Sequence, residues 1–419
     1  MPDESISANG RFMAKIVMKF GGTSVADLDR IRHVASLVAE EVKAGNQVAV
    51  VVSAMAGETN KLVGWVKALD PLYDPVEYDT VVAAGEQITA GLMAIALRKI
   101  GIKARSFLGW QMPLQTSGLH GSARIDGIPP EKLNACLESG TVAAVAGFQG
   151  VFADGRVSTL GRGGSDTSAV AIAAAIKADR CDIYTDVDGV YTTDPRIVSK
   201  ARRLPKIAFE EMLEMASLGA KVLQTRSVEI AMKFRVPVRV LSSFDPKAGG
   251  TLLCDEEDIV ENKPVTGIAY SRDEAKISLM KIPDRPGIAA AIFGPLADSG
   301  INVDMIVQNI SDDGKKTDLT FTCNRGDLAK ALAVLKKAET TIGYREISTD
   351  DNMAKVSIIG IGMRTHPGVA QSMFRTLSEK GINIQVISTS EIKVSVLIAE
   401  EYVELAVRAL HAAYHLDAA

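Results

Sequence analysis

A lysine followed by two adjacent glycines closes the first apolar run of the sequence, and these residue types suit phosphate binding. The run ends in Lys19–Ser24 (KFGGTS), and a helical stretch follows it. Backbone N–H groups of adjacent glycines can approach phosphate oxygens closely, and a helix N-terminus favours anions. The lysine can stabilise charge on a phosphoryl group in transfer. Neither GxxxxGKS/T nor GxGxxG occurs here, so on these residues alone a plain strand-to-helix turn fits about equally well.

A second glycine-rich turn surrounds an arginine. Thr159–Thr167 (TLGRGGSDT) precedes the apolar stretch Ser168–Ala178, which is predicted to be helical. Ser165 or Asp166 could cap that helix. Capping does not explain the three glycines around Arg162, whose forked guanidinium suits a carboxylate or a phosphate. The turn is therefore a candidate anion-binding site.

A third stretch, Tyr184–Arg196 (YTDVDGVYTTDPR), begins at the end of a predicted strand and continues as a loop. Ligands of open α/β sheets bind beyond the carboxyl ends of the strands. Asp186 or Asp188 could bind a metal, but acidic residues in a Gly/Pro loop more often form turns, and the glutamate of an EF-hand is missing. On the residues alone, Glu86 is an ordinary exposed glutamate of a helical stretch. The five histidines form no triad with a serine or a cysteine, so hydrolase chemistry has no support.

The elements that must position these residues alternate between short apolar runs and amphipathic helices, from Lys15 to about Ser243. This alternation predicts an α/β fold, with a mainly parallel central sheet between two helical layers. The helix Ala26–Lys43 has one apolar face, and Gly45 suits its end. The predicted strands are Lys15–Phe20, Gln47–Ser53, Lys103–Leu108, Thr141–Gly147, Asp182–Asp186 and Val236–Leu241.

The bulk properties limit the class of protein. A chain of 419 residues exceeds what one hydrophobic core usually supports, so two or three domains are expected. The net charge of -4 and the lack of a basic cluster argue against nucleic-acid binding. The four scattered cysteines indicate reduced thiols in a cytoplasmic protein and not a zinc site. The longest apolar stretches, Val48–Ala56 and Val142–Phe148, are shorter than the ~20 residues that cross a bilayer, and the polar N-terminus does not resemble a signal peptide.

The C-terminal part contains an internal repeat with an offset of 81 residues. Pro286–Ala289 matches Pro367–Ala370, and Gly300–Val303 matches Gly381–Ile384. A constant offset over that many positions indicates two copies of one unit. Each copy predicts the βαββαβ order of a ferredoxin-like sandwich.

Turn signals complete the predicted organisation. Asp312–Gly314 predicts a hairpin turn in the first copy, and the second copy has a shorter connection near Ser388–Glu391. The turn-rich and acidic stretch Phe244–Asn262 predicts a linker. The expected domains are the α/β domain at residues 13–245, the linker at 246–264, the first copy at 265–342 and the second at 343–419.

Taken together, these stretches resemble one family, the aspartate kinases of the amino-acid kinase superfamily. Lys19–Val25 (KFGGTSV) is similar to the family's opening signature, Thr159–Thr167 to its substrate loop, and Thr185–Arg196 to its nucleotide loop. The doubled Pro-Gly…Gly-Ile-Asn unit resembles tandem ACT domains, which bind amino-acid effectors. The signatures occur in the family's order, and the resemblance covers nearly the whole chain from about Lys15.

The resemblance implies transfer of the γ-phosphate of ATP to the side-chain carboxylate of L-aspartate, the first step of lysine, threonine and methionine biosynthesis. Lys19 and Asp166 would be catalytic. Mg²⁺ would be held mainly through the phosphates, with no metal site of the protein's own. Aspartate would contact Ser53, Thr59, Glu86, Arg124, Arg162, Gly163, Gly164 and Ser165. ATP would contact Lys19, Gly21, Gly22, Thr23, Ser24, Thr185, Asp186, Tyr191, Arg196 and Lys221.

The resemblance also implies regulation by lysine, threonine or both, and a homo-oligomer formed through the ACT copies. In some relatives an internal start makes a separate small regulatory subunit, and this remains an alternative here. The second copy could instead be purely structural, because its hairpin differs. The implied effector contacts of the first copy are Asp284, Arg285, Gly287, Ile288, Ala289, Asn302, Val303 and Gln308. Those of the second copy are Val369, Asn383, Ile384 and Glu391.

Two rival interpretations stay open at this point. Another amino-acid kinase, acting on glutamate, acetylglutamate, carbamate or UMP, would resemble only the N-terminal half and would usually lack the tandem ACT units. A catalytically silent amino-acid sensor would be expected to have lost Lys19, Glu86 or Asp166, and all three are present.

Overall fold

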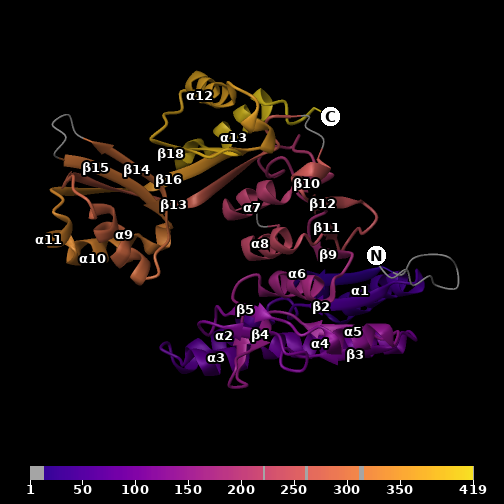
Figure 1. Ribbon diagram of the computed structural model, residues 1–419. Coiled ribbons are helices and arrows are strands. Elements are labelled where there is room, and N and C mark those ends of the chain that lie inside the picture. The colour runs from indigo at the N-terminus through magenta and orange to yellow at the C-terminus, as the bar shows by residue number, and fades with distance from the viewer. Residues whose placement is uncertain (1–13, 220–221, 260–262, 311–315, 419) are drawn as a thin grey trace. The chain divides into compact units, whose positions relative to one another are not determined.

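The structure, a computed structural model, describes residues 14–219, 222–259, 263–310 and 316–418 (Figure 1). Within these ranges the chain forms two units. The first contains the chain up to Val190, together with Arg203–Ser217 and residues 222–259. The second contains Tyr191–Arg202, residues 218–219 and the chain from residue 263 onward.

The first unit is built on a central sheet whose described strands follow the order β10-β12-β11-β9-β1-β2-β6-β3. All neighbouring strands pair in parallel except β11 and β12. β1 lies in the interior of the sheet, where Lys19 is opposite Val51 on one side and Ile183 on the other. The mainly parallel sheet is confirmed. Its strands are β1 (Lys15–Phe20), β2 (Gln47–Val52), β3 (Ala104–Phe107), β6 (Val142–Ala146), β9 (Arg180–Thr185), β10 (Lys206–Ala208), β11 (Val238–Ser242) and β12 (Gly250–Cys254).

One face of this sheet is covered by α1 (Leu28–Lys43) and α4 (Ala84–Lys99), whose apolar residues pack against Met18 and Val50. Asp27 begins α1, where its side chain accepts a hydrogen bond from the Arg30 N–H. α4 and the preceding α3 (Pro75–Val82) together are long and apolar enough to cross a membrane, and half of their most apolar window is buried inside the protein.

The opposite face carries α5 (Glu131–Glu138) and α6 (Gly164–Ile176), with α8 (Thr225–Phe234) packed on α6. Successive side chains of a strand point to opposite faces of the sheet. Met18 points to the face covered by α1, so the neighbouring Lys19 points to the face covered by α6. The three-layer arrangement predicted from the alternating pattern is therefore confirmed. The other elements are α2 (Glu58–Leu69), α7 (Phe209–Ser217) and a small sheet of β4 (Gln115–Ser117), β5 (Arg124–Gly127), β7 (Gln149–Val151) and β8 (Val157–Thr159).

The helix after the arginine turn differs from its prediction. It begins at Gly164, four residues before Ser168, and Gly163 is its N-cap with φ +69°. The predicted capping by Ser165 or Asp166 is wrong, because both residues lie inside the first turn. This early start is what leaves the carboxylate of Asp166 available for another partner.

The predicted linker also differs. Its stretch at residues 250–254 is β12, which pairs with β10 and β11 and buries Thr251 and Leu253. The interpretation of these residues as linker was wrong, because alternate side chains of the strand are buried in the first unit.

The second unit consists of two ferredoxin-like copies that share one sheet, ordered β14-β15-β13-β16-β18-β17 in its described strands. The hairpin near Ser388–Glu391 is confirmed, whereas Asp312–Gly314 lies outside the described residues. The elements are β13 (Gly267–Pro283), α9 (Ile288–Asp298), β14 (Val303–Ile310), β15 (Lys316–Cys323), α10 (Leu328–Lys337), α11 (Glu339–Ile342), β16 (Glu346–Ile359), α12 (Val369–Glu379), β17 (Val386–Thr389), β18 (Lys393–Ala399) and α13 (Val403–Ala413).

The two copies are intertwined through β13. Residues such as Ile277 and Leu279 of its second half belong to the core of the first copy. Ile268 in its first half instead packs with Val356 and Leu410 in the core of the second copy. The expected ranges 265–342 and 343–419 therefore differ from the folded copies, because the second copy takes its final strand from the start of β13 and not from the end of the chain.

The segment Tyr191–Arg202 leaves the first unit and packs within the second. Ile197 and Val198 contribute to the core of the second copy. The Ile268 N–H donates to the Thr192 carbonyl at 2.8 Å, and the Thr192 hydroxyl contacts Nε2 of His411 at 3.0 Å. The stretch predicted as one nucleotide loop is thus divided between the two units.

Candidate active site

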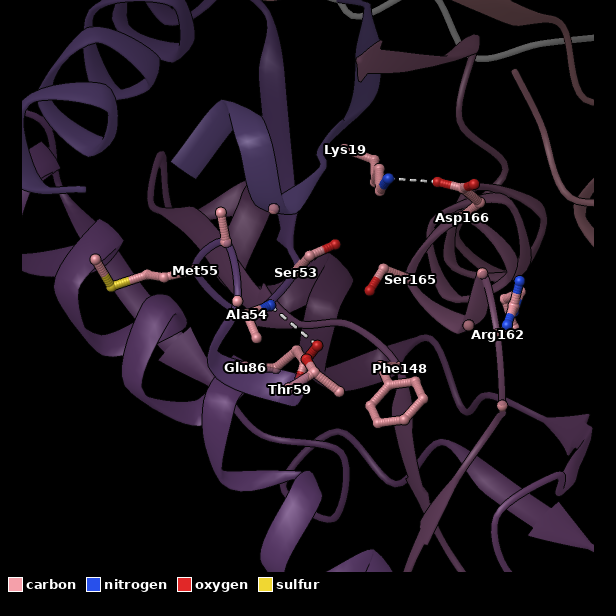
Figure 2. A pocket seen from close by; sticks show the side chains of 16 residues that line it. Lys19, Ser53, Ala54, Met55, Thr59, Glu86, Phe148, Arg162, Ser165 and Asp166 are labelled. Carbon is pink, nitrogen blue, oxygen red and sulfur yellow. Dashed lines mark hydrogen bonds and ion pairs between the residues drawn. The ribbon is translucent and has the colours of Figure 1, made fainter. Parts of the chain in front are cut away.

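The carboxyl ends of β1, β2 and β6 meet at one edge of the sheet, beside the first turn of α6, and a cavity of about 290 Å³ opens there (Figure 2). Parallel strands end at the same edge, which is why three separate loops reach one cavity. The lining residues are Lys19, Gly22, Ser53, Ala54, Met55, Ala56, Gly57, Thr59, Glu86, Phe148, Gly161, Arg162, Gly163, Gly164, Ser165 and Asp166.

A buried ion pair joins β1 to α6. Nζ of Lys19 lies 2.5 Å from Oδ1 of Asp166, and each residue is 8% exposed. Figure 2 shows the two side chains facing each other, with the hydroxyls of Ser53 and Ser165 pointing into the nearby space. The carboxylate holds the ammonium at the mouth of the glycine turn, where it can meet an incoming anion.

The turn after β1 gives that anion room. A Cβ added to Gly21 would lie 3.4 Å from Nζ of Lys19, and one added to Gly22 would lie 3.1 Å from the Ala54 carbonyl oxygen. The contact at Gly21 is of ordinary van der Waals length, whereas a side chain on Gly22 would crowd the loop after β2. The Gly21 N–H donates to the Tyr184 carbonyl at 3.3 Å, so within this pair the N–H of Gly22 is the better candidate for a phosphate oxygen. The hydroxyl of Ser24 is not accessible in this structure, because it is fully buried and hydrogen-bonded to Ser243. Thr23 is exposed and does not line the cavity.

Glu86 is a buried carboxylate in the first turn of α4. Gly85 lets this helix approach the loop after β2 closely, since a Cβ there would lie 2.7 Å from the Cβ of Ala54. Oε1 of Glu86 accepts a hydrogen bond from the Ala54 N–H at 3.0 Å, whereas Oε2 has no hydrogen-bond partner among the described residues. Burial raises the pKa of Glu86 to about 7. A buried carboxylate with a free oxygen in a cavity suits a cationic group of a ligand.

Arg162 stands on the loop between β8 and α6 and lines the cavity with an exposed side chain. The loop can turn there because Gly161 and Gly163 adopt φ values of +77° and +69°. Gly163 also lies against α8, and a Cβ there would come within 1.7 Å of Cγ of Gln224.

Gly163→Ala is therefore expected to destabilise the protein and to weaken ligand binding at Arg162. The left-handed conformation costs a non-glycine residue about 1–2 kcal/mol, and overpacking adds about 1–3 kcal/mol. Gly155→Ala is the matched control, because Gly155 has φ +85° with open space around its Cβ position. Urea unfolding of both variants measures the difference. Equal losses of stability in the two variants would show that the contact with Gln224 has no role.

Several predicted site residues lie elsewhere. Arg124 is exposed on β5 and does not line the cavity. Thr185 ends β9 and Asp186 follows it, and the Thr185 hydroxyl donates a hydrogen bond of 3.1 Å to Oδ1 of Asp186. Tyr191 and Arg196 belong to the second unit, where Arg196 is ion-paired with Asp194. Lys221 lies outside the described residues.

The predicted effector residues lie at the start of α9 and along β14 in the first copy, and at the corresponding places in the second. Gly287 and Gly368 are the N-caps of α9 and α12, with φ of +87° and +91°. The side chain of Ile288 is buried in the core of the first copy, so it stabilises the fold and is not accessible to a ligand. Asp284, Arg285, Ala289, Asn302, Gln308, Asn383 and Glu391 are exposed, and Val303, Val369 and Ile384 are partly buried.

Sequence reasoning missed the apolar part of the cavity. Phe148 lines it from the loop after β6 with φ +67°, a conformation that is uncommon for a residue with a side chain. Its backbone N–H donates to the hydroxyl of Ser168, which holds the loop against α6. The position of Phe148 directly after a predicted buried strand was the available signal, because ligands bind at the carboxyl ends of parallel strands.

The family models, the similar curated proteins and the similar solved structures all indicate the same family. The model of the amino acid kinase family matches residues 14–242, and ACT domain models match residues 277–340 and 356–414. The aspartate kinase of Pseudomonas putida KT2440 is 55% identical over 406 residues, which is 97% of this chain and 98% of that protein. The structure of Escherichia coli aspartokinase III in complex with aspartate and ADP (R-state) is 30% identical with a TM-score of 0.81, covering 96% of this chain and 99% of that one. The same enzyme in complex with lysine and aspartate (T-state) has a TM-score of 0.74 at 30% identity, with the same coverage.

Proposed function

This chain belongs to the aspartate kinase family, and from that premise we propose that it transfers the γ-phosphate of ATP to the β-carboxylate of L-aspartate, giving 4-phospho-L-aspartate. One observation carries the proposal. A single cavity contains the Lys19–Asp166 ion pair, the glycine turn after β1 and the unpartnered oxygen of Glu86. These groups suit a phosphoryl group at one end and an amino acid at the other.

The amino acid would be held by its charges. Its ammonium group would bind Oε2 of Glu86, and its α-carboxylate would bind the guanidinium of Arg162. The hydroxyls of Ser53 and Ser165 lie between Glu86 and the Lys19–Asp166 pair (Figure 2). Aspartate held in this way would direct its β-carboxylate toward Lys19, and Thr59 would complete the pocket.

The reaction would need no general base. A β-carboxylate is already ionised at pH 7, so no proton has to leave before attack. The difficulty is that one anion attacks another. The Lys19 ammonium and the N–H group of Gly22 would stabilise the charge of the transition state, while the Gly21 N–H donates to the Tyr184 carbonyl. The carboxylate oxygen forms a bond to the γ-phosphorus while the bond from that phosphorus to the ADP oxygen breaks.

A magnesium ion would be bound mainly by the nucleotide. Among the described residues, no group of three His, Cys, Asp or Glu side chains could hold a metal. Mg²⁺ commonly keeps few protein ligands and binds substrate phosphates in kinase sites. When bound, it would neutralise phosphate charge, and Thr185 and Asp186 would contact the nucleotide from the end of β9.

The two ACT copies would bind amino-acid effectors and pair between subunits. The complex of the E. coli relative with lysine favours lysine as one effector, with threonine as a second candidate. Effector binding would couple to catalysis with a free energy of ~1–3 kcal/mol. The activity would begin the biosynthesis of lysine, threonine and methionine in the cytoplasm, in keeping with four cysteines that are all free.

The proposed function is tested by ATP-dependent hydroxamate formation with L-aspartate, which traps the acyl phosphate. Lysine and threonine are then added singly and together. Product that falls with an effector supports both the kinase activity and the regulatory role. Product formation that no effector lowers supports the kinase activity but contradicts the proposed regulation. Product with another carboxylate but not with aspartate contradicts the proposed substrate.

The pKa of Glu86 leads to a pH dependence of aspartate binding. In the free protein this pKa is about 7, and only the ionised carboxylate attracts an ammonium group. The apparent KM for aspartate is therefore expected to fall by about tenfold from pH 6 to pH 8, following the ionised fraction of a group with that pKa. Steady-state kinetics at saturating ATP measure this fall. A KM that is constant over this range would show that Glu86 is already ionised at pH 6 or does not bind the ammonium.

A further inference from the structure

A fully buried carboxylate outside the cavity accepts hydrogen bonds from residues that are far apart in the sequence of the first unit. Asp79 of α3 is 0% exposed. Its oxygens accept hydrogen bonds from the N–H of Gly121 at 3.0 and 3.1 Å and from the N–H of Thr159 at 3.0 Å. They also accept from the Thr159 hydroxyl at 2.5 Å and from Nδ1 of His120 at 2.7 Å. A carboxylate so fully hydrogen-bonded fixes the relative position of every group that donates to it.

The donors of Asp79 stand at the base of the loop that carries Arg162. Thr159 is the last residue of β8, and Leu160, Gly161 and Arg162 follow it directly. The turn at Gly121 touches this loop, since a Cβ on Gly161 would lie 3.1 Å from the Gly121 carbonyl oxygen. Asp79 therefore holds both sides of the loop's base without lining the cavity.

A half-buried cation makes a second connection at the same place. Nη1 of Arg226 donates to the Leu160 carbonyl at 2.7 Å, and Nη2 donates to the Ala123 carbonyl at 3.0 Å. The Ala123 N–H in turn donates to the Thr159 carbonyl at 2.9 Å. The segments around residues 121–123 and 159–160 are thus joined by a carboxylate that binds N–H groups and a guanidinium that binds carbonyl groups.

We propose that Asp79 is a positioning residue of the substrate site, which sets the place of Arg162 by fixing the base of its loop. This inference rests on the proposed function, in which Arg162 binds the α-carboxylate of the substrate. Asp79 contacts no substrate itself. Its influence is directed at the amino acid and not at the nucleotide, because its donors lead to the Arg162 loop and not to the glycine turn after β1.

Asp79→Asn is the first test. The amide keeps the shape of the side chain but presents an NH₂ group to donors that need an acceptor. KM for aspartate is expected to rise by at least about tenfold, since small misplacements of a binding group can cost up to 10²-fold, while KM for ATP stays within about twofold. Thr159→Val is the second variant. It removes only the hydroxyl donor, so the rise in KM for aspartate is expected to be smaller. Because this change is milder, the variant is expected to fold and keeps the test possible if Asp79→Asn does not fold.

Asp74→Ala is the matched control. Asp74 begins the same helix, where its side chain accepts from the Val76 N–H, and its loss destabilises α3 without touching the Arg162 loop. Thermal unfolding is measured for all three variants. A rise of the aspartate KM in Asp79→Asn and Thr159→Val but not in Asp74→Ala supports the proposal. The proposal is overturned if KM for aspartate is unchanged in those of the two variants, Thr159→Val and Asp79→Asn, that fold. It is also overturned if KM for aspartate and KM for ATP change equally.

The test separates this inference from the proposed function. Wild-type protein that forms no hydroxamate with aspartate contradicts the proposed function, and the KM of the carboxylate that it does accept is then measured in the same variants. Wild-type activity with aspartate, together with variants that bind it normally, contradicts the inference alone.

Discussion

Lys19→Ala is expected to lower kcat by about 10²- to 10³-fold, the range seen when a group that stabilises transition-state charge is removed. KM for ATP is expected to change by less than about threefold, because the interaction strengthens only as charge develops in the transition state. The loss also leaves Asp166 as a carboxylate without its ion-pair partner at 2.5 Å. Steady-state kinetics with varied ATP at saturating aspartate measure both constants.

Lys15→Ala is the control for this substitution. Lys15 lies on the same strand at its opposite end, where Nζ donates to the side chain of Asn134 and the carbonyl of Ile176. Its removal takes the same charge from the chain without touching the cavity, so kcat should remain near the wild-type value. If Lys19→Ala raises KM for ATP and leaves kcat unchanged, Lys19 binds ground state and transition state equally, and its catalytic role is wrong.

Glu86→Gln is expected to raise KM for aspartate by about 10- to 100-fold, because a hydrogen bond to a charged group contributes about 1.5–3 kcal/mol. The amide has nearly the same shape and can keep the hydrogen bond from the Ala54 N–H, but it carries no charge for an ammonium group. The fall of KM between pH 6 and pH 8 should disappear in this variant, since no group with a pKa of about 7 remains there. Initial rates over a range of aspartate concentrations at three pH values test both points.

Glu77→Gln is the control variant, because it makes the same chemical change outside the cavity. Glu77 is largely exposed on α3 and pairs with Arg156 on the surface. Surface ion pairs contribute about 0–1 kcal/mol, so neither KM should move. An aspartate KM that stays at the wild-type value in Glu86→Gln would assign the ammonium to another group and would contradict the proposed orientation of the substrate.

Much of the molecule could be predicted from local patterns. Alternating strands and helices predict the parallel sheet because its βαβ units are local in sequence, and the glycine turns mark two of the loops that reach the cavity. Lys19 directly precedes the first of these turns, Arg162 lies in the second and Asp166 directly follows it, so their place at one cavity could be predicted from the sequence. For Glu86 the family resemblance was needed, since its burial depends on the close contact of Gly85 with Ala54 across two elements.

The remaining features depend on contacts between residues far apart in the chain. Asp166 could have capped its own helix, and only the fold shows that it meets Lys19. A repeat with a constant offset predicts two copies but not that β13 serves both, because the last strand of the second copy comes from the start of the first. Asp79 gave no signal in the sequence, since its partners lie about 40 and 80 residues away.

The path of Tyr191–Arg202 limits how this molecule can be shortened or recombined. A chain truncated after residue 259 would keep this segment but lose the strands and helices that bury Ile197 and Val198. Those side chains would then add to an exposed apolar patch, which favours aggregation. A gene fragment for residues 263–419 alone would lack the same side chains in its core. Exchange of the C-terminal unit between relatives is therefore expected to preserve this core only when Tyr191–Arg202 is exchanged with it, although some 60 codons separate the two regions of the gene.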